Sequence, residues 1–526
     1  MKEKEREQKE CFYSMDRRKF LKGLGGMAGM AAAWSIAKPG GVSQAFAAEP
    51  KRGGRLVFDV RSSPMGFDPT YFEIQEEYDI ASLCYNRLVR LTLDMKTVPE
   101  LAERWQPNKK GDEWTFWLRK GIKFHHGREL EAKDVVNSFN HYFDAKGPAA
   151  TELAPAKRAE IVDKYTVKIY LSTAYGEFPG TLGKPWAAVL PHDISFEKLK
   201  TTVTGTGPFK FKKIVPGEYT LVERNPDYWE KGFPYLDEVK QVVIPDFSTA
   251  MNALISGEID LMHECEPQQY FSLKKMQGQG IVARRVRSTG YNPVIMDIRK
   301  KPFNDPRIRQ AIKACVDREE FVDAVLNGLG TPANDHPIPP FYPYFADFPI
   351  KKQDYGRAKK LLADAGYPNG LKLKLHTSEV RAGMVPSAIT IKDQCAPAGI
   401  DIDVKIEPSD AFWKQVWRKV PFCVSNWHGR PNMYSSTFPY FHSNGKWNTG
   451  HINNPTLDSC IDEAVGETDT NRAMRLYVAA ESIVSELGGW VVPYTKDLVM
   501  AHLKKVQNWE VHSSKFRYFT KVWKKA

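Results

Sequence analysis

One short segment in the C-terminal third of the chain combines side chains that can hold a polar organic molecule. Residues 427–434 read Trp-His-Gly-Arg-Pro-Asn-Met-Tyr. Pockets for small organic molecules place a few polar groups among aromatic faces, as this segment does. Its guanidinium can bind a carboxylate or phosphate through two parallel hydrogen bonds and cannot lose its proton. We therefore predict ligand-binding roles for Trp427, His428, Arg430, Asn432 and Tyr434.

Two other interpretations of this segment stay open. It can be an ordinary mixed surface loop, and Arg430 can pair with a carboxylate of the protein instead of a ligand. His428 can hold a metal or simply donate a hydrogen bond in a cleft. Trp447 is either a binding or a core residue, whereas Trp413 and Trp417 share one helix face and are expected in the core.

The pattern around the segment predicts a parallel α/β sheet. Strand patterns at 371–375, 400–406 and 421–427 alternate with helix patterns at 385–396 and 411–419. This order is typical of a doubly wound sheet, whose ligands bind beyond the carboxyl ends of the strands. The candidate segment leaves the third of these strands. Further strands are predicted at 53–60, 114–118, 166–171, 219–222 and, in the tail, 517–520.

Sequence motifs of common enzymes and metal sites are absent. The chain contains no Gly-x-Ser-x-Gly turn and no His-Glu-x-x-His helix, because His263-Glu264 is followed by Pro267 where the second His would stand. None of its cysteines forms a Cys-x-x-Cys pair. We expect no catalysis, no cofactor and no resident metal. A secreted hydrolase remains an alternative, because the members of a catalytic triad are neighbours in space rather than in sequence.

Composition limits the class of protein. With 526 residues, 42% hydrophobic and 26% charged, the chain is long enough for several domains and has an ordinary globular make-up. The net charge is +12, but basic residues are scattered and do not alternate with aromatic ones. We therefore expect no nucleic-acid partner.

The first 47 residues have the features of an export signal. Asp16-Arg-Arg-Lys-Phe-Leu-Lys22 precedes a Gly- and Ala-rich apolar stretch, and Ala45-Phe-Ala47 offers small residues at a cleavage site. Paired arginines followed by this pattern resemble the twin-arginine signal. We expect cleavage near Ala47/Ala48 and a periplasmic mature protein. Six cysteines follow the signal, and we expect Cys84, Cys315 and Cys395 to be buried free thiols.

Over some 400 residues the chain resembles the bacterial extracellular solute-binding proteins of family 5, periplasmic receptors for dipeptides, oligopeptides, nickel and related cargo. The matching blocks occur in the family's order at 99–105, 114–127, 132–139, 205–209, 223–229, 254–260, 302–311 and 358–366. The resemblance implies a two-lobed periplasmic-binding-protein fold of α/β class, with mixed and doubly wound sheets and a hinge.

This resemblance also implies domain boundaries and a mode of action. Lobe I would comprise residues 48–290 with an extra subdomain at about 96–204, lobe II residues 291–495, and residues 496–526 would return to lobe I. The hinge would cross at 288–297 and 490–498. The lobes would close over one solute, and a monomer would deliver it to ABC importer permease subunits in the inner membrane.

The resemblance also suggests which residues contact the ligand, and at one position this chain differs from the family. The loop after the first strand contributes contacts in family members, which suggests Phe67, Asp68 and Tyr71, and hinge proximity suggests Tyr291 and Asn292. In peptide-binding relatives the loop matching 427–434 carries an Asp for the ligand's ammonium, where this chain has Arg430. We therefore expect a peptide-like or other small organic solute bearing a carboxylate. A metal–metallophore complex of the nickel type is the alternative.

Overall fold

The computed structural model describes residues 49–153, 155–342, 344–408, 411–428, 430 and 432–525. The predicted export signal thus lies outside the described residues. The chain from Pro50 to Ala526 forms one compact unit. Among the helices of the described part, none has the length and apolar character needed to cross a membrane.

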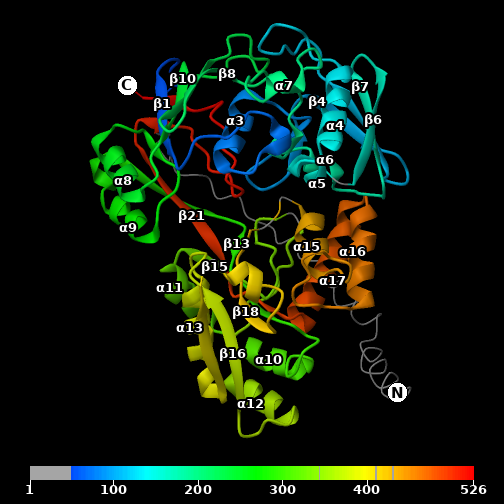
Figure 1. The fold of residues 1–526 in the computed structure, drawn as a ribbon, viewed down its shortest axis with the longest axis vertical. Coiled ribbons are helices and arrows are strands. Elements are labelled where there is room, and N and C mark those ends of the chain that lie inside the picture. The colour runs from blue at the N-terminus through cyan, green and yellow to red at the C-terminus, as the bar shows by residue number, and fades with distance from the viewer. Residues whose placement is uncertain are drawn as a thin grey trace, which may run out of the picture. The chain divides into compact units, whose positions relative to one another are not determined.

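The largest sheet joins segments from both halves of the chain. Its strands are β1 (Arg55–Val60), β8 (Phe209–Val215), β9 (Tyr219–Arg224), β10 (Glu238–Val243), β11 (Leu261–Met262), β12 (Ile281–Arg287), β15 (Gly330–Pro332) and β21 (Tyr494–Leu503). The order is β12-β21-β11-β1-β10-β9-β8, with β15 added to β21. β1 is parallel to β10 and β11, whereas β21 is antiparallel to β11 and β12. The C-terminal part of the chain therefore completes a sheet begun by its N-terminal part (Figure 1).

A smaller antiparallel sheet is inserted between β1 and β8. It has the order β4-β5-β7-β6 and consists of β4 (Ala102–Pro107), β5 (Glu113–Leu118), β6 (Ala156–Asp163) and β7 (Thr166–Leu171), while β2 (Val89–Leu91) pairs with β3 (Thr97–Pro99). In β5, Trp114, Phe116 and Leu118 are buried and the residues between them are partly exposed, as the two-residue period of a strand requires. The strands predicted at 114–118 and 166–171 are confirmed.

The second large sheet is mixed, and the three strands predicted in it confirm the parallel arrangement. Its order is β17-β16-β18-β14-β20, built from β14 (Val294–Met296), β16 (Leu371–Ser378), β17 (Ile400–Glu407), β18 (Phe422–Val424) and β20 (Trp490–Val491). β16 is parallel to both β17 and β18. The predicted helix at 411–419 is instead one π-helical turn, Phe412–Val416, because the backbone is extended at Trp417 and left-handed at Arg418, with φ 64°.

Two of the stretches of chain that connect the sheets are joined to each other by a hydrogen bond. The first runs from β12 through β13 (Gly290–Tyr291) into β14, and the second runs from β20 into β21. The Ser288 hydroxyl donates to the Lys496 carbonyl at 2.7 Å and so joins the two stretches. β13 also pairs with β19 (Trp427–His428), which brings the candidate segment to this connection.

Helices cover the sheets, and their ends follow the expected capping rules. Asp305 and Asp354 accept backbone N–H groups at the start of their helices, and Pro306 occupies a first helical position. The helices are α3 (Gln75–Cys84), α4 (Ala132–Ala145), α5 (Pro148–Glu152), α6 (Phe178–Thr181), α7 (Phe196–Leu199), α8 (Phe247–Ser256), α9 (Pro267–Lys275), α10 (Pro306–Ala314), α11 (Arg318–Leu326), α12 (Tyr355–Asp364), α13 (Met384–Cys395), α15 (Met433–Phe441), α16 (Pro455–Gly466) and α17 (Thr470–Leu487).

The C-terminal tail returns to the first sheet, but the strand predicted at 517–520 is wrong. Arg517 pairs with Asp79, and the Phe519 ring packs against Phe58 of β1 at 5.2 Å between centroids. Side chains rather than a backbone ladder therefore anchor this part. A later pair, β23 (Trp523–Lys524) with β22 (Val506–Gln507), forms the last strands.

The cysteines of the described residues are free thiols. Cys84, Cys315 and Cys395 are buried, which confirms the prediction for these three side chains. Burial raises the pKa of Cys423 to about 12, so this thiol stays protonated at neutral pH.

Candidate functional site

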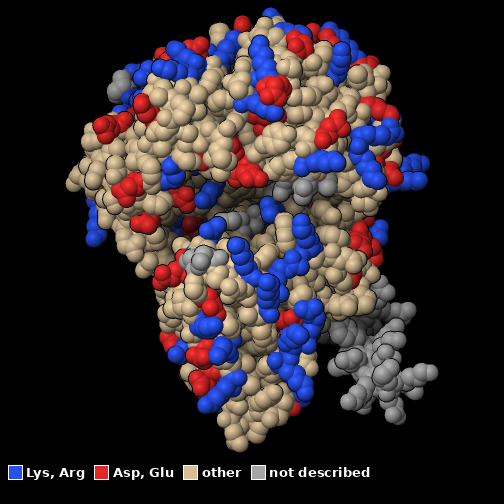
Figure 2. All heavy atoms as spheres, viewed as in Figure 1, with Lys and Arg blue, Asp and Glu red and all other residues tan. Residues whose placement is uncertain are grey.

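A cavity of about 620 Å³ lies where the two connecting stretches meet the candidate segment. Pockets of roughly 300–1,000 Å³ hold small organic ligands. Figure 2 shows a hollow on this face with Lys and Arg side chains around it. The described lining residues are Gln75, Tyr78, Lys184, Trp186, Glu264, Ser288, Thr289, Gly290, Arg381, Ala382, Asn426, Arg430, Lys496, Asp497, Leu498, Ser513, Ser514, Lys515 and Phe516.

An aromatic pair forms part of the wall. The rings of Tyr78, on α3, and Trp186 meet edge to face at 5.1 Å between centroids. The Trp186 indole N–H donates to the Phe72 carbonyl at 2.8 Å, which fixes the ring in place. Both side chains are half-buried, so they can offer an apolar surface to the body of a ligand.

Among the described lining residues, basic side chains outnumber acidic ones by five to two. The two acidic side chains are each neutralised within the protein: Glu264 by Lys515 at 3.0 Å, and Asp497 by Arg285. Burial pushes the pKa of Glu264 up, but Lys515 and other nearby cations bring it below its ordinary value, so this carboxylate stays ionised. The field in the cavity therefore favours an anionic group.

Arg430 is the predicted site residue that the structure places in this lining, among the residues described. Its Nε donates to the Tyr440 hydroxyl at 3.3 Å, and its guanidinium carbon lies 5.4 Å from the centre of the Trp447 ring. The Ser436 hydroxyl donates to the Arg430 carbonyl at 3.1 Å. Contacts with Ser436 and Tyr440 of α15 and with Trp447 thus hold the arginine at the cavity.

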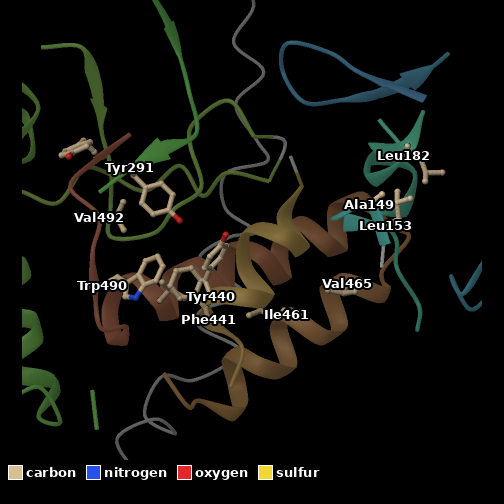
Figure 3. Packing of buried hydrophobic residues seen from close by; sticks show 14 of the residues in the cluster. Ala149, Leu153, Leu182, Tyr291, Tyr440, Phe441, Ile461, Val465, Trp490 and Val492 are labelled. Carbon is tan, nitrogen blue, oxygen red and sulfur yellow. The ribbon is translucent and has the colours of Figure 1, made fainter. Parts of the chain in front are cut away.

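Three of the six Phe, Tyr and Trp residues of the predicted site form a cluster around Trp490. The Trp427 ring stacks on Trp490 at 6.2 Å and meets Trp447 at 6.0 Å, and Tyr291 lies 6.4 Å from Trp490. Figure 3 shows Tyr291 and Trp490 grouped with Tyr440 from α15. Trp427, Trp447 and Tyr291 are therefore placed together as packing residues that support the segment carrying Arg430.

Other predicted residues shape the backbone around the cavity. Asn292 is fully buried, where it donates to the Ser425 carbonyl at 3.1 Å and accepts from the Tyr494 hydroxyl at 2.9 Å. His428 pairs with Gly290 through the backbone of β19 and β13. These contacts connect the candidate segment to both stretches that cross between the sheets.

The residues predicted from the loop after β1 lie outside the described lining. Phe67 packs in the core against Phe211, with 4.8 Å between ring centroids. Asp68 accepts from Thr70 at 3.0 Å and contacts His141 at 2.7 Å, which makes it a turn cap. The Tyr71 side chain is 46% exposed. The structure therefore does not bring these three side chains together with Arg430 at the described cavity.

Asn432 and Tyr434 lie where α15 meets the segment around α6. Asn432 caps α15 by accepting from Ser435 at 2.9 Å, and its amide donates to Thr181 at 3.2 Å. The Tyr434 ring packs against Tyr175 at 5.0 Å between centroids. Both residues therefore hold α15, and with it Arg430, against the part of the chain that follows β7.

A buried carboxylate stands at this contact. Glu177 accepts backbone N–H groups of Met433 at 3.4 Å and Tyr434 at 3.1 Å, and the Tyr477 hydroxyl at 3.1 Å. Burial raises the pKa of Glu177 to about 7, although these three donors oppose the shift. Sequence reasoning missed Glu177, since only the fold brings it to α15.

We expect Glu177 to make the stability of the protein depend on pH. Its pKa is about 7 in the folded chain against an ordinary value of 4.5, so between these values the folded chain holds a proton that the unfolded chain releases. Stability from this group therefore falls as the pH rises from about 5 to 8, by on the order of 2–3 kcal/mol. Thermal unfolding midpoints of wild type and Glu177→Gln across this range measure the effect.

The matched control for this experiment is Glu103→Gln, which changes an exposed carboxylate. Wild type and Glu103→Gln should share one pH profile, whereas Glu177→Gln should have a flatter one. The prediction is wrong if all three proteins follow the same profile.

Several lining residues gave no local signal in the sequence. Tyr78, Trp186, Lys496 and Lys515 come from four segments spread over more than 400 positions, and only the fold joins them. Among the described residues, no cluster of three or more His, Cys, Asp or Glu side chains could hold a metal ion.

Comparison with known proteins agrees with this architecture. Residues 96–449 match the family described as bacterial extracellular solute-binding proteins, family 5 Middle. Heme-binding protein A of Haemophilus influenzae is 27% identical, over 83% of this chain and 86% of that protein. The glutathione-binding protein GsiB of Pectobacterium atrosepticum is 25% identical, over 91% and 95%.

A solved structure shows the same fold. HbpA2 from Haemophilus parasuis superposes with a TM-score of 0.82 at 24% identity and covers 90% of this chain and 100% of that one. The two separate α/β sheets described above are thus those of the two-lobed periplasmic-binding-protein fold. The chain belongs to the bacterial extracellular solute-binding proteins of family 5, the solute-binding components of ABC importers.

Proposed function

We propose that the chain captures a small organic solute bearing a carboxylate, peptide-like or not, in the 620 Å³ cavity and delivers it to the permease of an ABC importer. The observation that carries this proposal is the lining itself, in which five basic side chains face two acidic ones and Arg430 is among the five. Relatives named for peptide, glutathione and heme binding support a solute of this size range.

The proposed mechanism is closure of two lobes over the solute. Lobe I would comprise residues 48–290 and 496–526, including a subdomain at about 96–204, and lobe II residues 291–495. Residues 288–297 and 490–498 would act as the hinge. Their support is that β13–β14 and β20–β21 are two stretches that connect the two large sheets and contact each other. A ligand that contacts both sides stabilises the closed form by its differential affinity for that form.

Export and assembly are part of the same proposal. The twin-arginine signal would direct the folded protein to the periplasm, with cleavage near Ala47/Ala48, and the mature protein would act as a monomer. N-terminal sequencing of the secreted protein and its elution volume on a sizing column test these two points.

Mass spectrometry of the protein purified from the periplasm tests the function. Native spectra should show the chain with one bound solute, and denaturing spectra should release a small organic acid unchanged. Release of a metal-containing complex would favour the metallophore alternative. Turnover of added peptides or esters would favour a hydrolase and overturn the proposal.

A further inference from the structure

Two basic side chains of the cavity other than Arg430 have no acidic partner among the described residues. Arg381 and Lys496 line the cavity, and no described carboxylate forms an ion pair with either. A solute with a single carboxylate on Arg430 would leave both of these charges in place. Like charges gathered in one partly desolvated cavity repel each other, and a second anionic group on the solute would reduce this repulsion.

Lys496 is a second basic side chain, besides Arg430, that can bind an anion in the cavity. It lies on β21, at the stretch that connects the sheets, and its Nζ donates to the Ala382 carbonyl at 3.0 Å. An ammonium group has three N–H donors, so this contact leaves donors for a ligand. Among the described residues, no carboxylate forms an ion pair with Lys496, which is half-buried.

Arg430 and Lys496 come from different parts of the fold but share one cavity. Arg430 belongs to the segment before α15 and Lys496 to β21, and both line the same 620 Å³ space. This volume is far larger than a carboxylate and leaves room for an organic body beside Tyr78 and Trp186. A molecule with an acidic group at each end offers one group to each of these two basic side chains.

We infer that the preferred solute carries two anionic groups, one bound by the Arg430 guanidinium and the other by the Lys496 ammonium. This inference rests on the proposed function, because it concerns the same cavity. It adds that a diacid is preferred over a monoacid and that Lys496 determines the preference.

Four matched probes test the inference by calorimetry on the full mature chain. N-succinyl-phenylalanine has two carboxylates, and N-butyryl-phenylalanine lacks the distal one. N-(4-aminobutyryl)-phenylalanine carries an ammonium in its place, and N-butyryl-phenylalanine amide has no charge. We expect the diacid to bind about tenfold or more tightly than the monoacid, and the ammonium probe to bind more weakly than the monoacid.

The variant Lys496→Met separates the second anion contact from the first. It should weaken the diacid about tenfold and leave the monoacid nearly unchanged, since only the diacid reaches this side chain. Lys275→Met is the matched control, because Lys275 is an exposed lysine at the end of α9, away from the lining. A melting temperature close to that of wild type shows that the variant is folded.

The affinity for the diacid measured over a pH series distinguishes ligand binding by Lys496 from a purely structural role, because a structural role would not make this affinity depend on the protonation of Lys496. Burial and then the nearby Lys515 lower the pKa of Lys496 to about 8, so above this pH the diacid must bind together with a proton. The diacid affinity should fall above pH 8 in wild type and stay flat in Lys496→Met. Among the described lining residues, the other titratable or charged side chains are Tyr78, Lys184, Glu264, Arg381, Arg430, Asp497 and Lys515.

Equal affinities for diacid and monoacid, or unchanged diacid binding in Lys496→Met, would overturn the inference but leave the proposed function standing. The inference that the solute carries two anionic groups would also be overturned if none of the four probes binds. The proposed function fails separately, when no solute co-purifies with the periplasmic protein and no probe binds.

Discussion

Replacing Arg430 by alanine lowers the affinity for N-butyryl-phenylalanine by about 30-fold or more, because removing one partner of a desolvated charged hydrogen bond costs roughly 2 kcal/mol or more. Arg430 lines the cavity and is held there by Tyr440 and by contacts at the start of α15. Its planar fork matches a carboxylate. Calorimetry with purified wild type and Arg430→Ala measures the change.

The amide of the same probe shows whether Arg430→Ala loses only the contact with the carboxylate or also changes the shape of the cavity. N-butyryl-phenylalanine amide should bind wild type and Arg430→Ala with similar affinity, since it offers no anion. Arg430→Lys should fall between wild type and the alanine variant, because lysine keeps the charge but loses the fork. Equal affinities of wild type and Arg430→Ala for every acid would show that Arg430 does not hold the ligand.

Replacing Trp490 by alanine lowers the free energy of unfolding by about 3–5 kcal/mol, the range for a large aromatic side chain deleted from a core. Trp490 is 1% exposed and stands at the centre of the aromatic cluster, with Phe441 at 4.9 Å and Tyr440 at 6.0 Å between ring centroids. Trp427 stacks on it at 6.2 Å. Guanidinium unfolding followed by circular dichroism measures the loss.

Trp413→Ala is the matched control for this loss, because it removes the same side chain from a site that is 37% exposed. Trp413 also contacts Phe412 and Trp417, so its deletion should cost about 1 kcal/mol, the average for a point substitution. Comparable losses for the two variants would contradict the central packing role of Trp490. Weaker solute binding in Trp490→Ala at a temperature where it is folded would show that the cluster also supports the segment of Arg430.

Local sequence patterns were sufficient to predict three of the five strands of the second large sheet, but not β14 and β20. The alternating residues of 371–375 and 400–406 and the helix between them form β16, α13 and β17 in the expected parallel order. Each of these elements buries a face that its own residue period defines. The π-helical turn at Phe412–Val416 departs from the prediction, because the backbone changes direction at Trp417 and Arg418.

The candidate site was only partly predictable, and Trp427 shows why. Successive side chains of a strand point to opposite faces, so a one-residue difference decides whether a residue faces the cavity or the core. Trp427 packs against Trp490, whereas its neighbour Asn426 lines the cavity. The sequence showed that aromatic residues gather here, but their orientation depends on the pairing of β19 with β13.

The remaining lining residues depend on long-range topology. Tyr78 and Lys515 belong to opposite ends of the chain, and they meet because the tail returns to the first sheet through Arg517 and Phe519. Arg430 was predictable because its type and its place after a strand were both visible in the sequence. Lys496 was not, because a lysine in a strand carries no signal until the cavity beside it is known.

X-ray scattering of the mature protein, with and without the solute that co-purifies with it, tests the account most directly. If two lobes close over a solute, the radius of gyration falls when the solute is added to the emptied wild type, and it stays constant for Arg430→Ala at the same solute concentration. An unchanged radius of gyration in wild type at saturating solute would contradict closure.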